Sequence, residues 1–169
     1  MGKPVCPFLR TPEHAVEAML RLATPAEADL VYDLGCGDGA ISLEVARTCG
    51  ARCVGFDIDE VHLASARTAA EAHDLSALLE YRNDDVLELD FSPATVLVIF
   101  LVPNMLAVLA PKFRQMKAGT RIVSYHFPLP DWAPVTTEET DHPHTAPPAT
   151  TSVYYYIVDG SSSNDEPSE

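Results

Sequence analysis

A strand–turn–helix–strand pattern between Leu30 and Ile58 constrains the fold of this chain more than any other feature. The stretch reads LVYDLGCGDGAISLEVARTCGARCVGFDI. An apolar run ends at Asp33 beside a turn with three glycines, a helix-like segment follows, and a second apolar run ends at Asp57. The pattern predicts a βαβ unit of a parallel sheet, whose glycine turn lets a nucleotide-like ligand approach the main chain.

Further apolar runs extend this unit into one α/β domain. We expect strands at 30–34, 53–56, 79–82, 95–102, 121–125 and 153–158, with a weaker strand at 135–138. We expect helices at 12–24, 40–49, 60–73, 104–109 and 112–116, the first capped by Thr11. The unbroken apolar run 95–102 indicates a central strand covered on both faces. The chain therefore predicts a mostly parallel sheet with helices on both faces and an antiparallel C-terminal strand.

Length and composition fit one domain at residues 1–159. The chain has 169 residues, of which 47% are hydrophobic and 21% are charged, as in an ordinary soluble domain. Residues 1–10 look like an extended lead-in, and residues 160–169 (GSSSNDEPSE) look like a disordered acidic tail. The four cysteines have no metal-binding spacing, so we expect free thiols.

The charge balance restricts the class of partner. The net charge is −14, and the 11 lysines and arginines are scattered along the chain. Such a field repels phosphate backbones and favours cationic partners such as lysine side chains, so we expect no nucleic-acid partner. No apolar run approaches the roughly 18 residues that span a bilayer, and no targeting segment is evident, so we expect no transmembrane segment and a cytoplasmic location.

The glycine spacing favours one class of ligand. Dinucleotide folds use G-x-G-x-x-G, whereas this chain has G-x-G-x-G directly after Asp33. A carboxylate there would repel a pyrophosphate but suits a sulfonium and an ammonium, and the next helix can offer free N–H groups. The pattern resembles D/E-x-G-x-G-x-G of the class I S-adenosylmethionine-dependent methyltransferases. A purely structural turn and a dehydrogenase are the alternatives.

Carboxylates at the ends of the next two strands fit that ligand. Asp57 can accept both ribose hydroxyls, and Ile58 beside it can pack on the adenine face. The alternative role for Asp57 is a helix N-cap, which Asp59 fills better. The resemblance implies that Asp85 accepts from the adenine amino group, with Asp84 as its rival. It also implies further cofactor contacts at Thr11, Gly35, Cys36, Gly37 and Val86.

Three segments resemble one family more specifically. They are Cys6–Leu20 with PF-x-x-T, Val96–Leu106 closing in VPNM, and Arg121–Pro134 with F-P-x-P-x-W-x-P. With the glycine turn, the similarity covers most of residues 5–135 and points to the lysine methyltransferases of the ATP synthase c subunit and the adenine nucleotide translocase. It implies in-line methyl transfer to a deprotonated lysine amine of a protein, leaving S-adenosylhomocysteine.

The acceptor site is expected at the end of the fourth strand. The (N/D)PP(Y/F) tetrapeptide of enzymes that methylate exocyclic amines of nucleobases or the glutamine of release factors is absent there. An apolar pocket of Phe100, Pro103 and Trp132 could desolvate the lysine, with Asn104 or His126 as catalytic residues that orient the amine. The spacing of the other histidines does not indicate a metal site.

The cellular location and the class of acceptor each have more than one interpretation in the sequence. Mitochondrial members of the family look as if they carry a hydrophobic segment before PF-x-x-T, and six residues precede Pro7 in this sequence. A mitochondrial location is therefore implied only by the family resemblance and by no targeting segment in the sequence. A small-molecule methyltransferase and a non-catalytic cofactor-binding scaffold are the alternative functions, and no feature indicates an oligomeric state.

Overall fold

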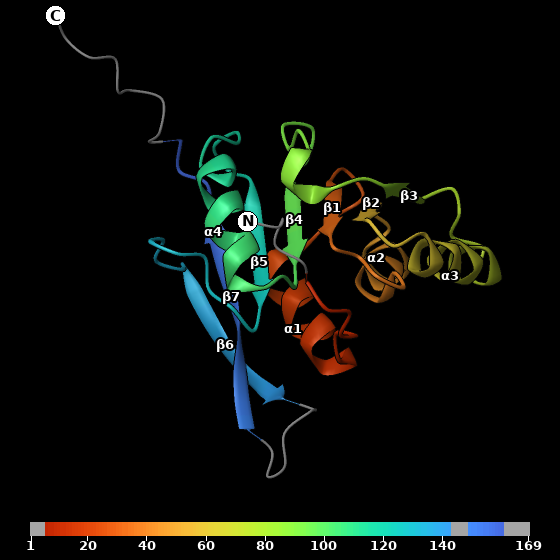
Figure 1. Ribbon diagram of the computed structural model, residues 1–169, viewed down its shortest axis with the longest axis horizontal. Coiled ribbons are helices and arrows are strands. Elements are labelled where there is room, and N and C mark those ends of the chain that lie inside the picture. Colours follow the sequence, from red (N-terminus) through yellow and green to blue (C-terminus); the bar gives the residue numbers. More distant parts are fainter. Residues whose placement is uncertain (1–5, 143–148, 161–169) are drawn as a thin grey trace, which may run out of the picture.

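The computed structural model describes residues 6–142 and 149–160, which build one seven-stranded sheet of order β3-β2-β1-β4-β5-β7-β6 (Figure 1). Strands β1 to β5 pair in parallel, and β7 pairs antiparallel with both β5 and β6. This confirms the mostly parallel sheet with an antiparallel C-terminal strand. The strands are β1 Leu30–Leu34, β2 Arg52–Asp57, β3 Leu79–Asn83, β4 Val96–Ile99, β5 Arg121–Tyr125, β6 Thr136–His142 and β7 Ala149–Ile157.

Helices cover both faces of the sheet, because successive strand side chains point to opposite sides. In β4, Val96 and Val98 pack with α1, α2 and α3, whereas Leu97 and Ile99 pack with α4. All four side chains are fully buried, as expected for a central strand. The helices are α1 Glu13–Ala23, α2 Ala40–Glu44, the π-helical turn η1 Val45–Cys49, α3 Glu60–Ala72, the 3-10 turn η2 Val86–Glu88 and α4 Pro103–Phe113.

The segment after β4 differs from the prediction in two ways. The strand ends at Ile99, so residues 100–102 leave the sheet and turn toward a cavity. One helix, α4, replaces the two short predicted helices and carries Pro111 in its interior. Pro111 lacks an N–H for the helix ladder, but it lies on the exposed face of the helix. Burial of Leu109 and Phe113 on the opposite face outweighs the lost hydrogen bond.

The start of α1 also differs. Pro12 is the cap residue and Thr11 makes no capping bond; Thr11 is instead 7% exposed and lines the same cavity. The predicted tail from residue 161 onward lies outside the described residues, as do Pro143 and His144. None of the described helices is long and apolar enough to span a bilayer. The four cysteines are free thiols, as predicted.

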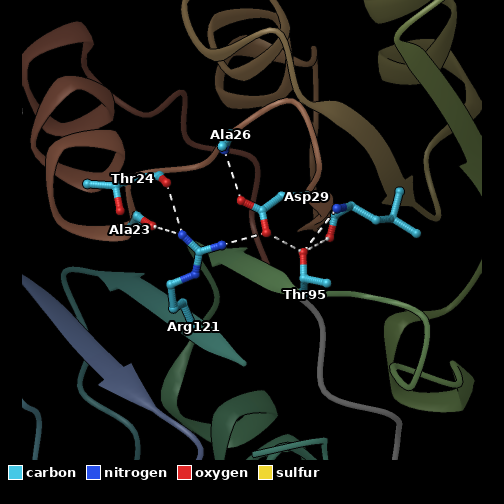
Figure 2. Close-up of polar contacts among 7 residues, drawn as sticks. Ala23, Thr24, Ala26, Asp29, Thr95 and Arg121 are labelled. Atoms are coloured by element: carbon cyan, nitrogen blue, oxygen red, sulfur yellow. Dashed lines mark hydrogen bonds and ion pairs between the residues drawn. The ribbon is translucent and has the colours of Figure 1, made fainter. Parts of the chain in front are cut away.

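A polar network ties α1 to the edge of the sheet opposite that cavity (Figure 2). The guanidinium of Arg121, in β5, donates to the carbonyls of Ala23 at 2.7 Å and Thr24 at 2.9 Å, which end α1. It also pairs with Asp29 at 2.5 Å, and Asp29 accepts from the Thr95 hydroxyl at 2.8 Å. The network fixes the segment that leads into β1, and β1 in turn carries the glycine turn.

Candidate functional site

A cavity of about 570 Å³ opens at the carboxyl ends of the parallel strands. Its size is that of small-molecule sites, and it lies where the strand order reverses between β1 and β4. Residues at the ends of β2 and β3 line one end, and residues at the ends of β4 and β5 line the other end. We call these the carboxylate end and the aromatic end. The former holds Asp57, Asp84 and Asp85, and the latter holds Phe100, Tyr125, His126 and Phe127.

The glycine turn forms the floor between the two ends. The N–H groups of Gly35 and Cys36 both donate to the carbonyl of Phe56, each at 2.9 Å, which ties the turn to the end of β2. Gly35 has φ +72°, and a Cβ on it would lie 2.7 Å from Leu101 Cδ2. The turn therefore needs glycine at this position for its backbone angle and for the close approach of the chain after β4.

Asp33, which the sequence predicted as a cofactor contact, is buried behind the turn and is not among the residues that line the cavity. It is 1% exposed, and its carboxylate accepts the N–H of Ser42 in α2 at 3.1 Å. Asp38 accepts the N–H of Ala40 at 3.3 Å. These two N–H groups of the first helical turn are therefore not free for a ligand. Burial, with smaller contributions from Asp57 and Asp38, raises the pKa of Asp33 to about 7.

Asp57 lines the cavity at the end of β2 and holds the turn in place. One oxygen accepts the N–H of Gly37 at 2.8 Å, and the other accepts the N–H of Asp59 at 2.9 Å. Asp59 caps α3 by accepting from Val61 at 2.9 Å, as the sequence predicted. Ile58 also lines the cavity and is 65% exposed, so its side chain is available to a flat ligand face.

Both candidate acids after β3 lie at the carboxylate end, together with Val86. Asp85 caps the 3-10 turn η2 by accepting from Leu87 at 3.0 Å, which fixes its carboxylate at the rim. Asp84 is exposed and lines the same rim. The cavity therefore brings Asp57, Ile58, Asp85 and Val86 together, as predicted.

The described part of the N-terminal segment, residues 6–12, lies over the cavity, which the sequence did not indicate. The rings of Phe8 and His62 have centroids 4.1 Å apart, and a Cβ on Gly37 would lie 2.3 Å from the Phe8 ring. Arg10 pairs with Asp38 at 2.9 Å. Thr11 in this segment and Cys36 in the glycine turn also line the cavity, where the sequence placed them.

Aromatic rings form the other end of the cavity. Phe100 packs edge-to-face on Tyr125, with centroids 4.8 Å apart, and His126 lies 4.3 Å from Phe127 by the same measure. His126 has φ +72°, and its Nδ1 lies 2.6 Å from the hydroxyl of Thr151. A left-handed backbone at a residue with a side chain is strained and is concentrated at functional sites. Tyr125 is a member of this end that the sequence did not reveal.

Three residues predicted for the acceptor site do not line the cavity. Trp132 packs on the α4 side of the sheet, 5.5 Å from the Tyr156 ring and 4.6 Å from the Arg114 guanidinium. Pro103 and Asn104 are exposed at the start of α4. Leu101, Val102 and Met105 occupy the wall in their place. In the part of the chain that the structure describes, no three His, Cys, Asp or Glu side chains converge on a metal position.

Known proteins share both the sequence and the fold. The ANTKMT methyltransferase domain family matches residues 33–136. This chain belongs to that family. A protein-lysine N-methyltransferase of Saccharolobus islandicus is 35% identical over 133 residues, which cover 78% of this chain and 83% of the relative. The adenine nucleotide translocase lysine N-methyltransferase of Mus musculus is 33% identical over 131 residues, or 76% of this chain and 56% of the relative.

A solved structure extends the similarity to almost the whole ANTKMT-type chain. An RNA methyltransferase from Salinibacter ruber, in complex with S-adenosylhomocysteine, is 35% identical with a TM-score of 0.81. The match covers 95% of this chain and 100% of that one. The class I methyltransferase fold and S-adenosylmethionine as cofactor, both expected from the sequence, are thereby confirmed. The names of the relatives differ in the acceptor, protein in one case and RNA in another.

Proposed function

We propose that this methyltransferase transfers a methyl group to a lysine side chain of a protein. The observation that supports the proposal is the division of the cavity into a carboxylate end and an aromatic end. The first suits the hydroxyls and amino groups of a cofactor, and the second suits an alkyl amine that must lose its water shell. The two ends meet over the glycine turn, where donor and acceptor would come together.

The carboxylate end fits the chemical groups of the cofactor. Each Asp57 oxygen accepts one backbone N–H and keeps a further lone pair for a ribose hydroxyl. Ile58 would pack on the adenine face, and Asp85, with Asp84 as rival, would accept from its amino group. Gly35, Cys36, Thr11 and Val86, which line the cavity, would make the remaining contacts. Gly37, predicted as a further contact, does not line the cavity, and its N–H donates to Asp57. When bound, S-adenosylmethionine supplies a methyl group already activated by its sulfonium.

The aromatic end fits the demands on the acceptor. A lysine has a pKa near 10.4 in water, and removal from water favours the neutral amine that can attack. Phe100 and its aromatic neighbours would exclude water, and His126, held by Thr151, would orient the amine. Asn104 is exposed beside this end and is the weaker candidate. Holding the nitrogen about 3–3.5 Å from the methyl carbon, in line, supplies much of the acceleration.

Electrostatics favour protein over RNA as the acceptor. The chain carries a net charge of −14 and its cavity rim carries five aspartates, at positions 38, 57, 59, 84 and 85. Arg10 is the one lysine or arginine that lines the cavity among the described residues, and it is paired with Asp38. Such a rim repels a phosphate backbone and attracts an ammonium group.

Transfer of label from S-adenosylmethionine with a radioactive methyl group tests the acceptor class. The purified protein is incubated with a soluble cell extract, and portions are then treated with protease or with ribonuclease. We expect label that protease releases from the precipitate and that ribonuclease leaves in place. Ribonuclease-sensitive label would support RNA methylation, and label confined to small molecules would support a small-molecule methyltransferase.

Calorimetry with S-adenosylhomocysteine tests separately whether the carboxylate end binds the cofactor. Asp57→Ala removes the proposed ribose partner, so we expect at least a tenfold loss of affinity. Asp90→Ala removes an exposed acid that accepts from Ser92 outside the cavity, and it should leave the affinity unchanged. Unfolding curves of both variants show whether the turn itself has collapsed. Unchanged affinity in a folded Asp57→Ala protein would rule out the ribose role.

A further inference from the structure

We propose that the hydroxyl of Tyr125 positions the acceptor amine. This role rests on the proposed function and adds one residue to the acceptor site. Tyr125 ends β5 at the aromatic end of the cavity and is 2% exposed. Among the described residues its hydroxyl is the one buried side-chain nitrogen or oxygen with no hydrogen-bond partner. A group of this kind calls for an explanation, because native proteins pair almost all buried polar atoms.

Two other buried tyrosines show the ordinary arrangement. The Tyr156 hydroxyl accepts the N–H of Leu129 at 2.9 Å, and the Tyr81 hydroxyl lies 3.0 Å from the hydroxyl of Ser42. Both hydroxyls are satisfied within the fold, away from the aromatic end. Tyr125 differs from them because it lines the cavity. The missing partner is therefore expected from what the cavity binds.

The surrounding rings hold Tyr125 in one place. The ring centroids of Phe100, Tyr125 and His126 form a triangle with sides of 4.8, 6.1 and 6.4 Å. The Tyr125 backbone is fixed by its pairing with Val153 of β7. Burial raises the pKa of Tyr125, so its phenol stays neutral. A neutral phenol in a rigid ring cluster is a fixed hydrogen-bonding point in a site from which water is largely excluded.

The chemistry of transfer gives this point a function. A neutral amine has two N–H donors and one lone pair, and the lone pair must face the methyl carbon. If one N–H donates to the Tyr125 oxygen, the lone pair is turned away from the ring cluster and toward the carboxylate end. The amine nitrogen then forms its bond to carbon as the carbon–sulfur bond breaks, with that electron pair passing to sulfur. The acceptor ammonium has lost one proton to water before this step, and the product leaves as the methylammonium ion.

Tyr125→Phe tests the proposal, with Tyr156→Phe as the matched control. Each substitution removes one buried phenolic oxygen and keeps the ring. We expect Tyr125→Phe to melt at the same temperature as the unmodified chain or higher, because it removes an unpaired polar atom. Its affinity for S-adenosylhomocysteine should be unchanged, whereas kcat with n-butylamine, and with extract proteins, should fall by about 10- to 100-fold. KM for n-butylamine should change less than kcat.

Tyr156→Phe should show the opposite pattern. It leaves the Leu129 N–H without its acceptor, so its melting temperature should fall while kcat per folded molecule stays unchanged. A Tyr125→Phe protein with an unchanged kcat, or one destabilised like Tyr156→Phe, would overturn the positioning role. Unmodified protein that neither binds nor methylates n-butylamine and labels no protein would contradict the proposed function, and the Tyr125 role with it.

Discussion

Asp33 shows at the scale of one residue how the fold tolerates an unfavourable charge. Burial raises its pKa to about 7, whereas the unfolded carboxyl titrates near pH 4 (~3.9). Between these values the folded chain binds the extra proton, so stability falls as pH rises from about 4 to about 7. In Asp33→Asn we expect the fall in unfolding free energy between pH 4 and pH 7 to be smaller by a few kcal/mol, since each pKa unit is worth ~1.4 kcal/mol. Urea unfolding at pH 5 and pH 8 measures it, and an equal slope in both proteins would contradict the raised pKa.

Gly35 allows a second residue-scale test, with Gly119 as its control. Both have positive φ, +72° and +90°, but a Cβ at Gly119 meets nothing within 4 Å. Gly119→Ala should therefore cost only the backbone strain, roughly 1–2 kcal/mol. Gly35→Ala should cost about 1–3 kcal/mol more because its Cβ would overlap Leu101, and it should also weaken S-adenosylhomocysteine binding. Equal losses of unfolding free energy would show that Leu101 simply moves aside.

The residues at the carboxylate end of the cavity could be predicted from the sequence, whereas those at the aromatic end could be predicted only in part. Asp57 and Asp85 directly follow strands, so the parallel sheet alone brings them to one edge. Trp132 lies in a loop whose return to the α4 side depends on packing against Tyr156, which no local pattern encodes. The role of Tyr125 was hidden because a strand pattern does not show which buried hydroxyl lacks a partner.

At the scale of elements, hydrophobic runs placed the strands well because both faces of this sheet are buried. The predicted ends of helices and strands were wrong where the same residues were compatible with two local structures. Pro111 can begin a helix or sit on the exposed side of one, and only packing of Phe113 decides. The apolar residues 100–102 continue the β4 pattern in sequence but face the cavity instead. The π-helical turn η1 leaves no distinct sequence pattern.

Arg121 tests how α1 is held to the sheet (Figure 2). Burial would raise the pKa of Asp29, but hydrogen bonds from Arg121, Thr95 and Ala26 outweigh burial and lower it. Arg121→Leu removes the guanidinium donors from that carboxylate and from the carbonyls that end α1, so we expect a loss of about 2–3 kcal/mol in unfolding free energy. The loss should shrink as pH falls through the lowered pKa of Asp29. Chemical unfolding at several pH values measures both effects.

Arg21 supplies the control for this element. It also pairs with a carboxylate, that of Glu138 in β6, but its side chain is 59% exposed against 22% for Arg121. Arg21→Leu should therefore change the unfolding free energy much less than Arg121→Leu does, because solvent screens an exposed ion pair. If both substitutions cost the same, the partly buried network would not be what fixes α1.

At the scale of the whole molecule, the charge of −14 should act on the acceptor before it binds. Attraction between exposed charges is screened beyond about 8–10 Å at physiological ionic strength. For a basic protein acceptor we expect kcat/KM to fall severalfold between low and high salt, mainly through association. With n-butylamine, which carries one charge, the fall should be much smaller. Stimulation of protein methylation by salt would contradict the electrostatic argument.

Amino-acid analysis of labelled protein identifies which side chain receives the methyl group. Protein labelled from radioactive S-adenosylmethionine is washed in base, which removes methyl esters, and is then hydrolysed completely in acid. We expect the label to elute with Nε-methylated lysines, and we expect Asp57→Ala to abolish it. Label that elutes with methylated arginine, histidine or glutamine products, or that is found in RNA alone, would contradict lysine methylation by this chain.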